Sequence, residues 1–104
     1  MKGILIEPGK APAVASLPDS LWAIENRLGT PCEMIVLPRT PAVLFVGKYE
    51  GPVQPASLFN RTYRGRQLLG PILCYGWKAN NIQPMSKALQ TEMLEHITDY
   101  EVKA

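Results

Sequence analysis

Three arginines and several aromatic side chains gather in and just after the stretch FNRTYRGRQLLGP, residues 59–71. A guanidinium group presents a planar fork of donors that matches a phosphate or a carboxylate, and an aromatic ring beside it can stack on a base. The pattern predicts a binding site for an anionic small ligand or an acidic partner protein. Its residues would be Arg61, Arg64, Arg66, Tyr63, Tyr75 and Trp77.

Strand geometry and salt dependence limit what this stretch can bind. If residues 61–68 are extended, Arg61 points to one face and Arg64 and Arg66 point to the other, so the three do not converge. Three phosphate contacts would give a log–log salt slope of about −2.7 on duplex DNA, which is weak for a dedicated nucleic-acid-binding protein. A small nucleic-acid-binding domain that uses the stretch from Arg61 to Arg66 is therefore the alternative hypothesis.

The distribution of charge offers the arginines an internal partner as well. The formal net charge is only +2, yet no acidic residue lies between Glu50 and Glu92. The C-terminal segment then carries four acids: Glu92, Glu95, Asp99 and Glu101. A basic middle and an acidic end can neutralise each other in the fold, which would leave the arginines a solvated or helix-pairing role.

The residue types that usually perform catalysis are sparse. His96 is the one histidine, and it lies among acids on a helix flank, where a surface role is the simpler interpretation. A nucleophilic pair of His96 with Cys32 or Cys74 is the enzymatic alternative, but apolar neighbours raise a thiol's pKa and lower its reactivity. No metal-ligand spacing and no phosphate-binding glycine loop is present. We expect a non-enzymatic protein without metal or cofactor, with both cysteines as free buried thiols.

The chain of 104 residues has the length of a single domain, residues 1–104, and ten prolines divide it into short elements. Strands are predicted at 2–7, 32–37, 42–48 and 70–77, with a short one at 13–15. The apolar run at 42–48 indicates a central strand covered on both faces, paired with 32–37 as an antiparallel hairpin. Residues 49–69 are predicted to be irregular.

Two amphipathic segments predict helices. Leu21, Ile24 and Leu28 share one face of the first helix, which Ser16 or Asp19 can cap and which ends at Gly29. Ser86 can cap the second, and Trp22 and Trp77 would border the core. The order β-α-β-β-(irregular)-β-α predicts an α+β fold, a small mixed or antiparallel sheet of about four to five strands with the helices on one face. An edge strand, 13–15 or 42–48, could support a homodimer.

The stretches ILIEPGKAPAV, CEMIVL, SLFNR and GPILCYGW, followed by a helix, resemble a family of small domains encoded by phages, plasmids and conjugative elements of Firmicutes (domain of unknown function three-eight-four-six). Its most specific parts here are residues 7–10, 60–61 and 70–72. The resemblance implies a non-enzymatic accessory protein of a mobile element in the host cytoplasm. Such a protein would bind a host or phage protein or an anionic ligand, for instance to counteract a host defence.

No apolar run approaches the length of a membrane span.

Overall fold

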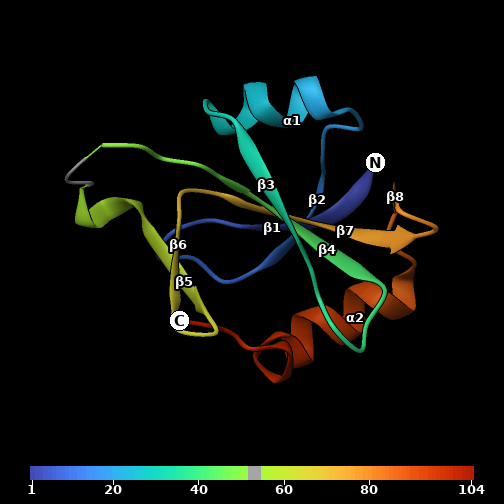
Figure 1. Ribbon diagram of the computed structural model, residues 1–104. Helices are drawn as coiled ribbons and strands as arrows, with labels where there is room; N and C mark the ends of the chain where they lie inside the picture. Colours follow the sequence, from blue (N-terminus) through green and yellow to red (C-terminus); the bar gives the residue numbers. More distant parts are fainter. Residues whose placement is uncertain (52–54) are drawn as a thin grey trace.

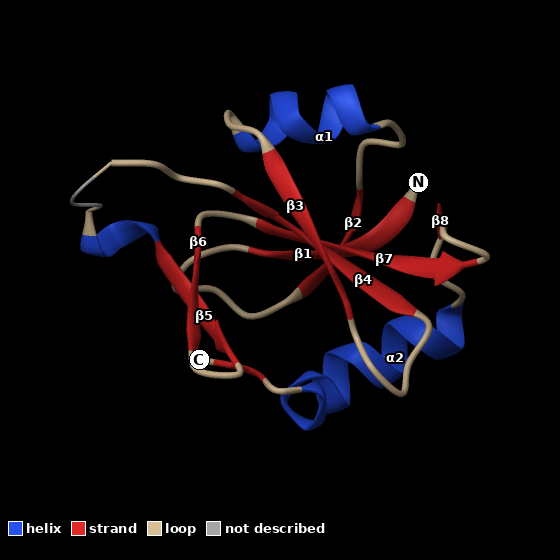
Figure 2. Cartoon of the chain, viewed as in Figure 1, coloured by secondary structure: helices blue, strands red, loops and turns tan. Residues whose placement is uncertain are grey.

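The computed structural model describes residues 1–51 and 55–104, and it folds them into two antiparallel sheets and two helices. The main sheet has the strand order β2-β1-β7-β4-β3, and β8 pairs with the end of β7. Figure 2 shows these strands crossing the centre of the molecule. The strands of this sheet are β1 (Lys2–Ile6), β2 (Ala13–Ser16), β3 (Cys32–Val36), β4 (Ala42–Gly47), β7 (Ile72–Lys78) and β8 (Asn81–Gln83). The α+β class and the hairpin of β3 with β4 are as predicted.

The helices α1 (Leu21–Leu28) and α2 (Lys87–His96) cover opposite faces of the main sheet, as Figure 1 shows. On one face Ile24 and Leu28 of α1 pack against alternate residues of β4 and β7. On the other face Met93 of α2 packs against the residues between them. The prediction that both helices lie on one face is wrong. Residues 42–46 of β4 are all buried because each face of the sheet has its own helix.

Short polar residues fix where the helices begin. The Ser20 hydroxyl accepts a hydrogen bond from the Ala23 N–H, so Ser20 caps α1 instead of Ser16 or Asp19. Gly29 ends α1 in the left-handed conformation at φ 73°, and Ser86 caps α2, both as predicted.

Trp22 of α1, expected at the edge of the core, is 75% exposed. Neither helix in the described part of the chain is long and apolar enough to cross a membrane.

Two strands of a second sheet form within the segment that was expected to be irregular, and the third comes from the end of the chain. Its order is β6-β5-β9, built from β5 (Phe59–Tyr63), β6 (Arg66–Leu69) and β9 (Val102–Lys103). The short 3-10 helices η1 (Ala56–Leu58) and η2 (Ile97–Tyr100) lead into β5 and β9. The described residues therefore hold nine strands rather than four or five. Residues 52–54, which also fell in the expected irregular segment, lie outside the described residues.

Asn60 joins the small sheet to the main one. Its Nδ2 donates to the carbonyl oxygens of Ile6, at 2.8 Å, and Gly70, at 2.7 Å, and the residue is only 3% exposed. Leu68 and Val102 of the small sheet are buried in the same apolar cluster as α2. The small sheet is thus held by a buried amide and by shared core contacts.

The strands at the two ends of the main sheet's order are β2 and β3, and the short β8 also pairs with a single strand, β7, in the described residues. The strand predicted at 13–15 is an edge, because β2 pairs only with β1 in the described residues. The proposed alternative edge, 42–48, is wrong: β4 lies between β3 and β7 and is hydrogen-bonded on both sides.

Candidate binding site

The basic stretch folds as a hairpin whose tip is Arg64-Gly65. Both tip residues have positive φ, 49° and 79°, and Tyr63 pairs with Arg66 across them. Two successive positive φ values are the geometry of a type I′ turn, which matches the twist of a two-stranded hairpin. The chain therefore reverses between the second and third arginines, and the assumption of one extended segment over 61–68 is wrong.

Each of the three arginines bonds to a different part of the chain. Arg64 Nε donates to Glu101 Oε2 at 2.6 Å, beyond the last helix, and its guanidinium lies 5.4 Å from the Tyr63 ring centre. Arg61 donates to the Lys10 carbonyl oxygen at 2.6 Å and to Asn60 Oδ1 at 3.0 Å. Arg61 thus takes a structural role, holding the loop after β1 against β5.

Arg66 makes a bidentate pair with Glu33 on β3. Its NH1 donates to Glu33 Oε2 at 3.0 Å and its NH2 donates to Glu33 Oε1. The hydrogen bonds from Arg66 lower the pKa of the Glu33 carboxyl, and the charges of Arg66 and Lys48 lower it further. Arg66 pairs with Glu33, and Arg64 pairs with Glu101. Acids of the same chain therefore do pair with the basic stretch, but only Glu101 belongs to the acidic C-terminal segment, whereas Glu33 lies on β3.

The two aromatic residues predicted from β7 do not lie with the arginines. Tyr75 is fully buried, donates its hydroxyl to the Pro18 carbonyl oxygen at 2.6 Å and packs edge-on against Phe45. Burial raises its pKa. Trp77, further along β7, is half-buried on the α1 side. Tyr75 is excluded from a surface site because β7 is the central strand, covered on both faces.

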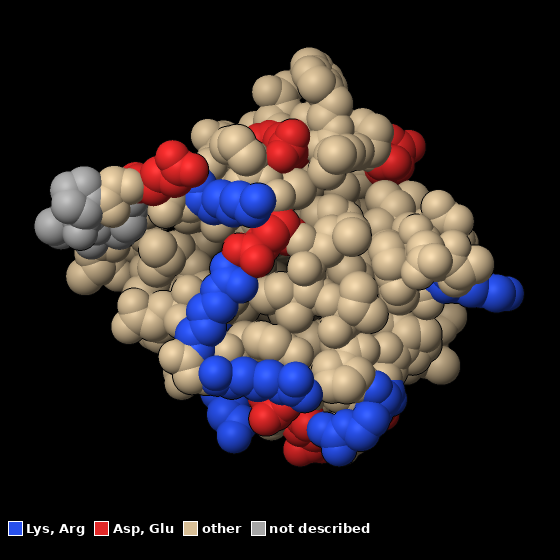
Figure 3. All heavy atoms as spheres, in the orientation of Figure 1, with Lys and Arg blue, Asp and Glu red and all other residues tan. Residues whose placement is uncertain are grey.

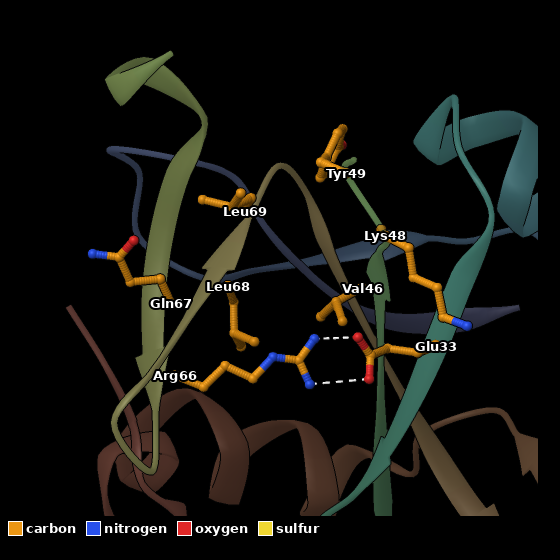
Figure 4. Close-up of a pocket in the computed structure, with 9 residues that line it drawn as sticks. Glu33, Val46, Lys48, Tyr49, Arg66, Gln67, Leu68 and Leu69 are labelled. Carbon is orange, nitrogen blue, oxygen red and sulfur yellow. Dashed lines mark hydrogen bonds and ion pairs between the residues drawn. The ribbon is translucent and has the colours of Figure 1, made fainter. Parts of the chain in front are cut away.

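A pocket of about 260 Å³ opens where the two sheets meet, beside the Arg66–Glu33 pair. Figure 4 shows Arg66 and Glu33 reaching toward one another across it, with Lys48 on the side of β3 and β4. The lining residues come from β3, from the end of β4 and the residues after it, and from β6: Glu33, Val46, Gly47, Lys48, Tyr49, Arg66, Gln67, Leu68 and Leu69. Two positive side chains and one negative side chain leave the pocket with an excess of one positive charge.

Tyr49 forms a wall of the pocket because two glycines make room for its ring. A Cβ on Gly70 would lie 2.2 Å from the Tyr49 hydroxyl oxygen, and one on Gly47 would lie 2.8 Å from the ring. Gly70 also has φ 70°, a conformation that glycine adopts readily. The residues Glu33, Lys48 and Tyr49 were missed by the sequence reasoning. Glu33 could have been recognised from the sequence, since it is the one charged residue in an otherwise apolar strand and therefore needs a polar partner.

His96, Cys32 and Cys74 are the residues that were considered for catalysis. His96 lies exposed between Glu95 and Asp99, and both cysteines are free. Burial raises the pKa of the Cys74 thiol to about 12. No cluster of three or more His, Cys, Asp or Glu residues is placed to hold a metal ion in the part of the chain that the structure covers.

A protein-family model described as a domain of unknown function (DUF3846) matches residues 1–98. The chain belongs to this family. The match covers the main sheet, both helices, and all the pocket residues, and it ends before β9. Among curated proteins and among solved structures no match was found. The DUF3846 description states no activity, so the function is argued from the pocket.

Proposed function

We propose that this protein acts by binding, and that the pocket at Arg66 holds an acidic group of its ligand. The observation that carries the proposal is the bidentate contact of Arg66 with Glu33 at the pocket. The Arg66 fork is already arranged for a carboxylate, and the same geometry suits a phosphate. The Glu33 carboxylate thus stands in for the acidic group that the ligand would bring.

The size of the pocket sets the kind of ligand. Pockets for whole small molecules span about 300–1,000 Å³, whereas this one is about 260 Å³. It accommodates one acidic group with a few neighbouring atoms. A side-chain carboxylate of a partner protein, or the charged end of a small acid, fits this volume better than an entire nucleotide does.

We also propose a setting for this binding activity, supported by the family resemblance. We place the protein among the accessory proteins of phages and other mobile elements, acting in the host cytoplasm on a host or phage protein. Counteracting a host defence component is the form of action that such a binding protein would take. Enzymatic activity is not part of the proposal, because the pocket holds a carboxylate paired with a guanidinium but no nucleophile activated by a neighbour.

The first test is a titration followed by NMR with citrate and inorganic phosphate as probes. Arg66→Ala should abolish shifts of the pocket residues. Glu33→Gln should strengthen binding about two- to fivefold, because an exposed ion pair contributes up to about 1 kcal/mol that a ligand would otherwise have to displace. Arg27→Ala on α1 is the matched control, since Arg27 also faces an acid, Glu7 at 3.7 Å, away from the pocket. Equal binding by wild type and Arg66→Ala would overturn the pocket proposal.

The second test uses host lysate and asks whether a protein partner depends on the same residue. Wild type, Arg66→Ala and Arg27→Ala would be used as baits in parallel. A partner that is captured by wild type and Arg27→Ala but lost with Arg66→Ala supports the proposal. A partner retained equally by all three baits would mean that the protein binds through another surface.

A nucleic acid is the second candidate ligand. Figure 3 shows basic side chains following one another along the side of the small sheet. The pKa of the Glu101 carboxyl is lowered by the hydrogen bond from Arg64 and then by the charges of Arg64, Arg39 and Lys103, so these three basic residues lie near it. If this row binds a phosphate backbone, gel shifts with single-stranded and duplex DNA should appear at low salt and weaken steeply as salt rises. Absence of a shift at low salt would eliminate this candidate.

A further inference from the structure

The strand β3 is a free edge whose exposed groups match those of a second copy of itself. Within residues 1–51 and 55–104, no strand pairs with β3 on the side away from β4. Figure 3 shows a broad area without charged side chains over β3 and β4, to one side of the basic row. Met34 and Val36 of β3 are 51% and 48% exposed in this region.

The register with β4 determines which backbone groups of β3 are free. The Lys48 N–H donates to the Pro31 carbonyl, and the Leu37 N–H donates to the Ala42 carbonyl. Bonded and non-bonded positions alternate along an antiparallel pair, so the odd-numbered residues of β3 bond to β4. Cys32, Met34 and Val36 therefore direct their N–H and C=O groups to the free side.

One of these free donors is already satisfied inside the molecule. The Cys32 N–H donates to Glu25 Oε2 at 2.8 Å. Among the described residues, no partner bonds the N–H or C=O of Met34 or Val36. The side chains of Cys32, Met34 and Val36 also share one face of the sheet, because side chains alternate along a strand.

Natural edge strands usually carry a charge or a proline that prevents pairing with another chain. Glu33 is the one charged residue between Pro31 and Pro38, and it lies on the other face, held by Arg66. On the apolar face of the edge the one charged group is the Glu25 carboxylate at the Cys32 N–H, and none lies beside Met34 or Val36 in β3 itself. The opposite edge differs, since β2 has Ser16 beside Val14 and begins directly after Pro12.

We propose that β3 pairs with β3 of a second copy of this chain, antiparallel about a two-fold axis at Met34. In this register Met34 exchanges both backbone bonds with the partner's Met34. The Val36 N–H then donates to the carbonyl of the partner's Cys32, and the reciprocal bond forms on the other side. On the free side the Glu25 carboxylate already accepts from the Cys32 N–H, so it must turn aside where the partner's Val36 carbonyl approaches.

The side chains of the edge are complementary in the same register. Cys32 lies opposite the partner's Val36, and Met34 lies opposite the partner's Met34, so six apolar side chains form one continuous stripe. Cross-strand apolar pairs of this kind are the units that stabilise a sheet. The result is one sheet that continues through both copies.

The test is the mass of the whole chain in solution, measured by sedimentation up to about 1 mM, the weak end of specific association. Wild type should approach twice the 11.5 kDa of one chain as concentration rises. Met34→Lys should remain at 11.5 kDa, because two lysines would face each other at the two-fold axis. Val14→Lys is the matched control on β2, where Val14 is 40% exposed, and should dimerise like wild type. Unchanged thermal unfolding of dilute Met34→Lys would exclude a folding defect.

A cross-linking experiment tests the register. Met34→Cys on a Cys32→Ser background should oxidise to a disulfide-linked dimer, because the paired Cα atoms would lie within the roughly 4.4–6.8 Å that a disulfide spans. Val14→Cys on the same background should cross-link far less. A wild-type chain that stays monomeric at all concentrations, or a Met34→Lys chain that dimerises equally well, overturns the proposal.

Discussion

Replacing Asn60 with alanine should weaken the junction between the two sheets by a measurable amount. The change removes the donor to the Ile6 and Gly70 carbonyl oxygens in a site that is 3% exposed. Each hydrogen bond contributes about 1 kcal/mol, and a buried acceptor left without a donor costs about 1–3 kcal/mol. We expect the free energy of unfolding to fall by about 2–4 kcal/mol. For a domain of about 100 residues this lowers Tm by about 10–30 °C.

The assay is urea unfolding at pH 7 followed by circular dichroism. Asn60→Asp should also be destabilised, because its carboxylate would face the two carbonyls, and it should recover partly at acidic pH, where a protonated carboxyl can donate. Asn81→Ala is the control, since Asn81 bonds the Ala79 carbonyl oxygen at 3.0 Å in an exposed turn, and it should change stability by less than about 0.5 kcal/mol. An Asn60→Ala protein as stable as Asn81→Ala would refute the reasoning.

Three further changes should separate the contributions of the pocket and the core. Glu33→Gln should cost about 0.5–1 kcal/mol of unfolding free energy at pH 7. Because the pKa of Glu33 in the folded protein lies below its ordinary 4.5, the difference from wild type should shrink as pH falls below 4.5 and vanish once the folded carboxyl is protonated. A difference in stability that persists at pH 2 would contradict this. Gly70→Ala should cost at least about 1 kcal/mol through strain at positive φ and shift the Tyr49 ring resonances; unchanged spectra would count against the close packing. The Cys74 thiol, with a pKa of about 12, should react with a thiol reagent only when the protein unfolds, and fast labelling of Cys74 in native protein, located by mass spectrometry, would show otherwise.

Local patterns in the sequence were sufficient to predict the parts of the fold that depend on neighbours in the chain. The apolar run of β4, the hairpin with β3 and the Ser86 cap all follow from residue types and spacing. The same run also argues for a helix on each face of the sheet, because a strand buried on both faces needs a covering layer on each side. The prediction of two helices on one face was inconsistent with this. Trp22 likewise lies about 200° around the helix from Ile24, so helical geometry alone places it away from the core.

The candidate site depends on contacts that no local pattern contains. Glu33 and Arg66 are 33 positions apart and meet only because β6 folds back beside β3 and β4. Tyr49 reaches the pocket because Gly70, 21 positions later, has no side chain to block it. The basic stretch indicated the region, but topology decided that Arg66 faces the pocket while Arg61 serves the junction at Asn60.

The central place of β7 in the main sheet has a consequence for the order in which the chain can fold during synthesis. β7 lies between β1 and β4 and also pairs with β8, yet it is the seventh strand to be made. Until residue 78 has left the ribosome, the β1–β2 and β3–β4 hairpins have no shared neighbour, and each presents an unpaired apolar strand. Long-range pairings of this kind are slow and expose the nascent chain to aggregation. The main sheet must therefore assemble late, as a nearly whole-chain event, when β7 enters the gap between two hairpins already formed.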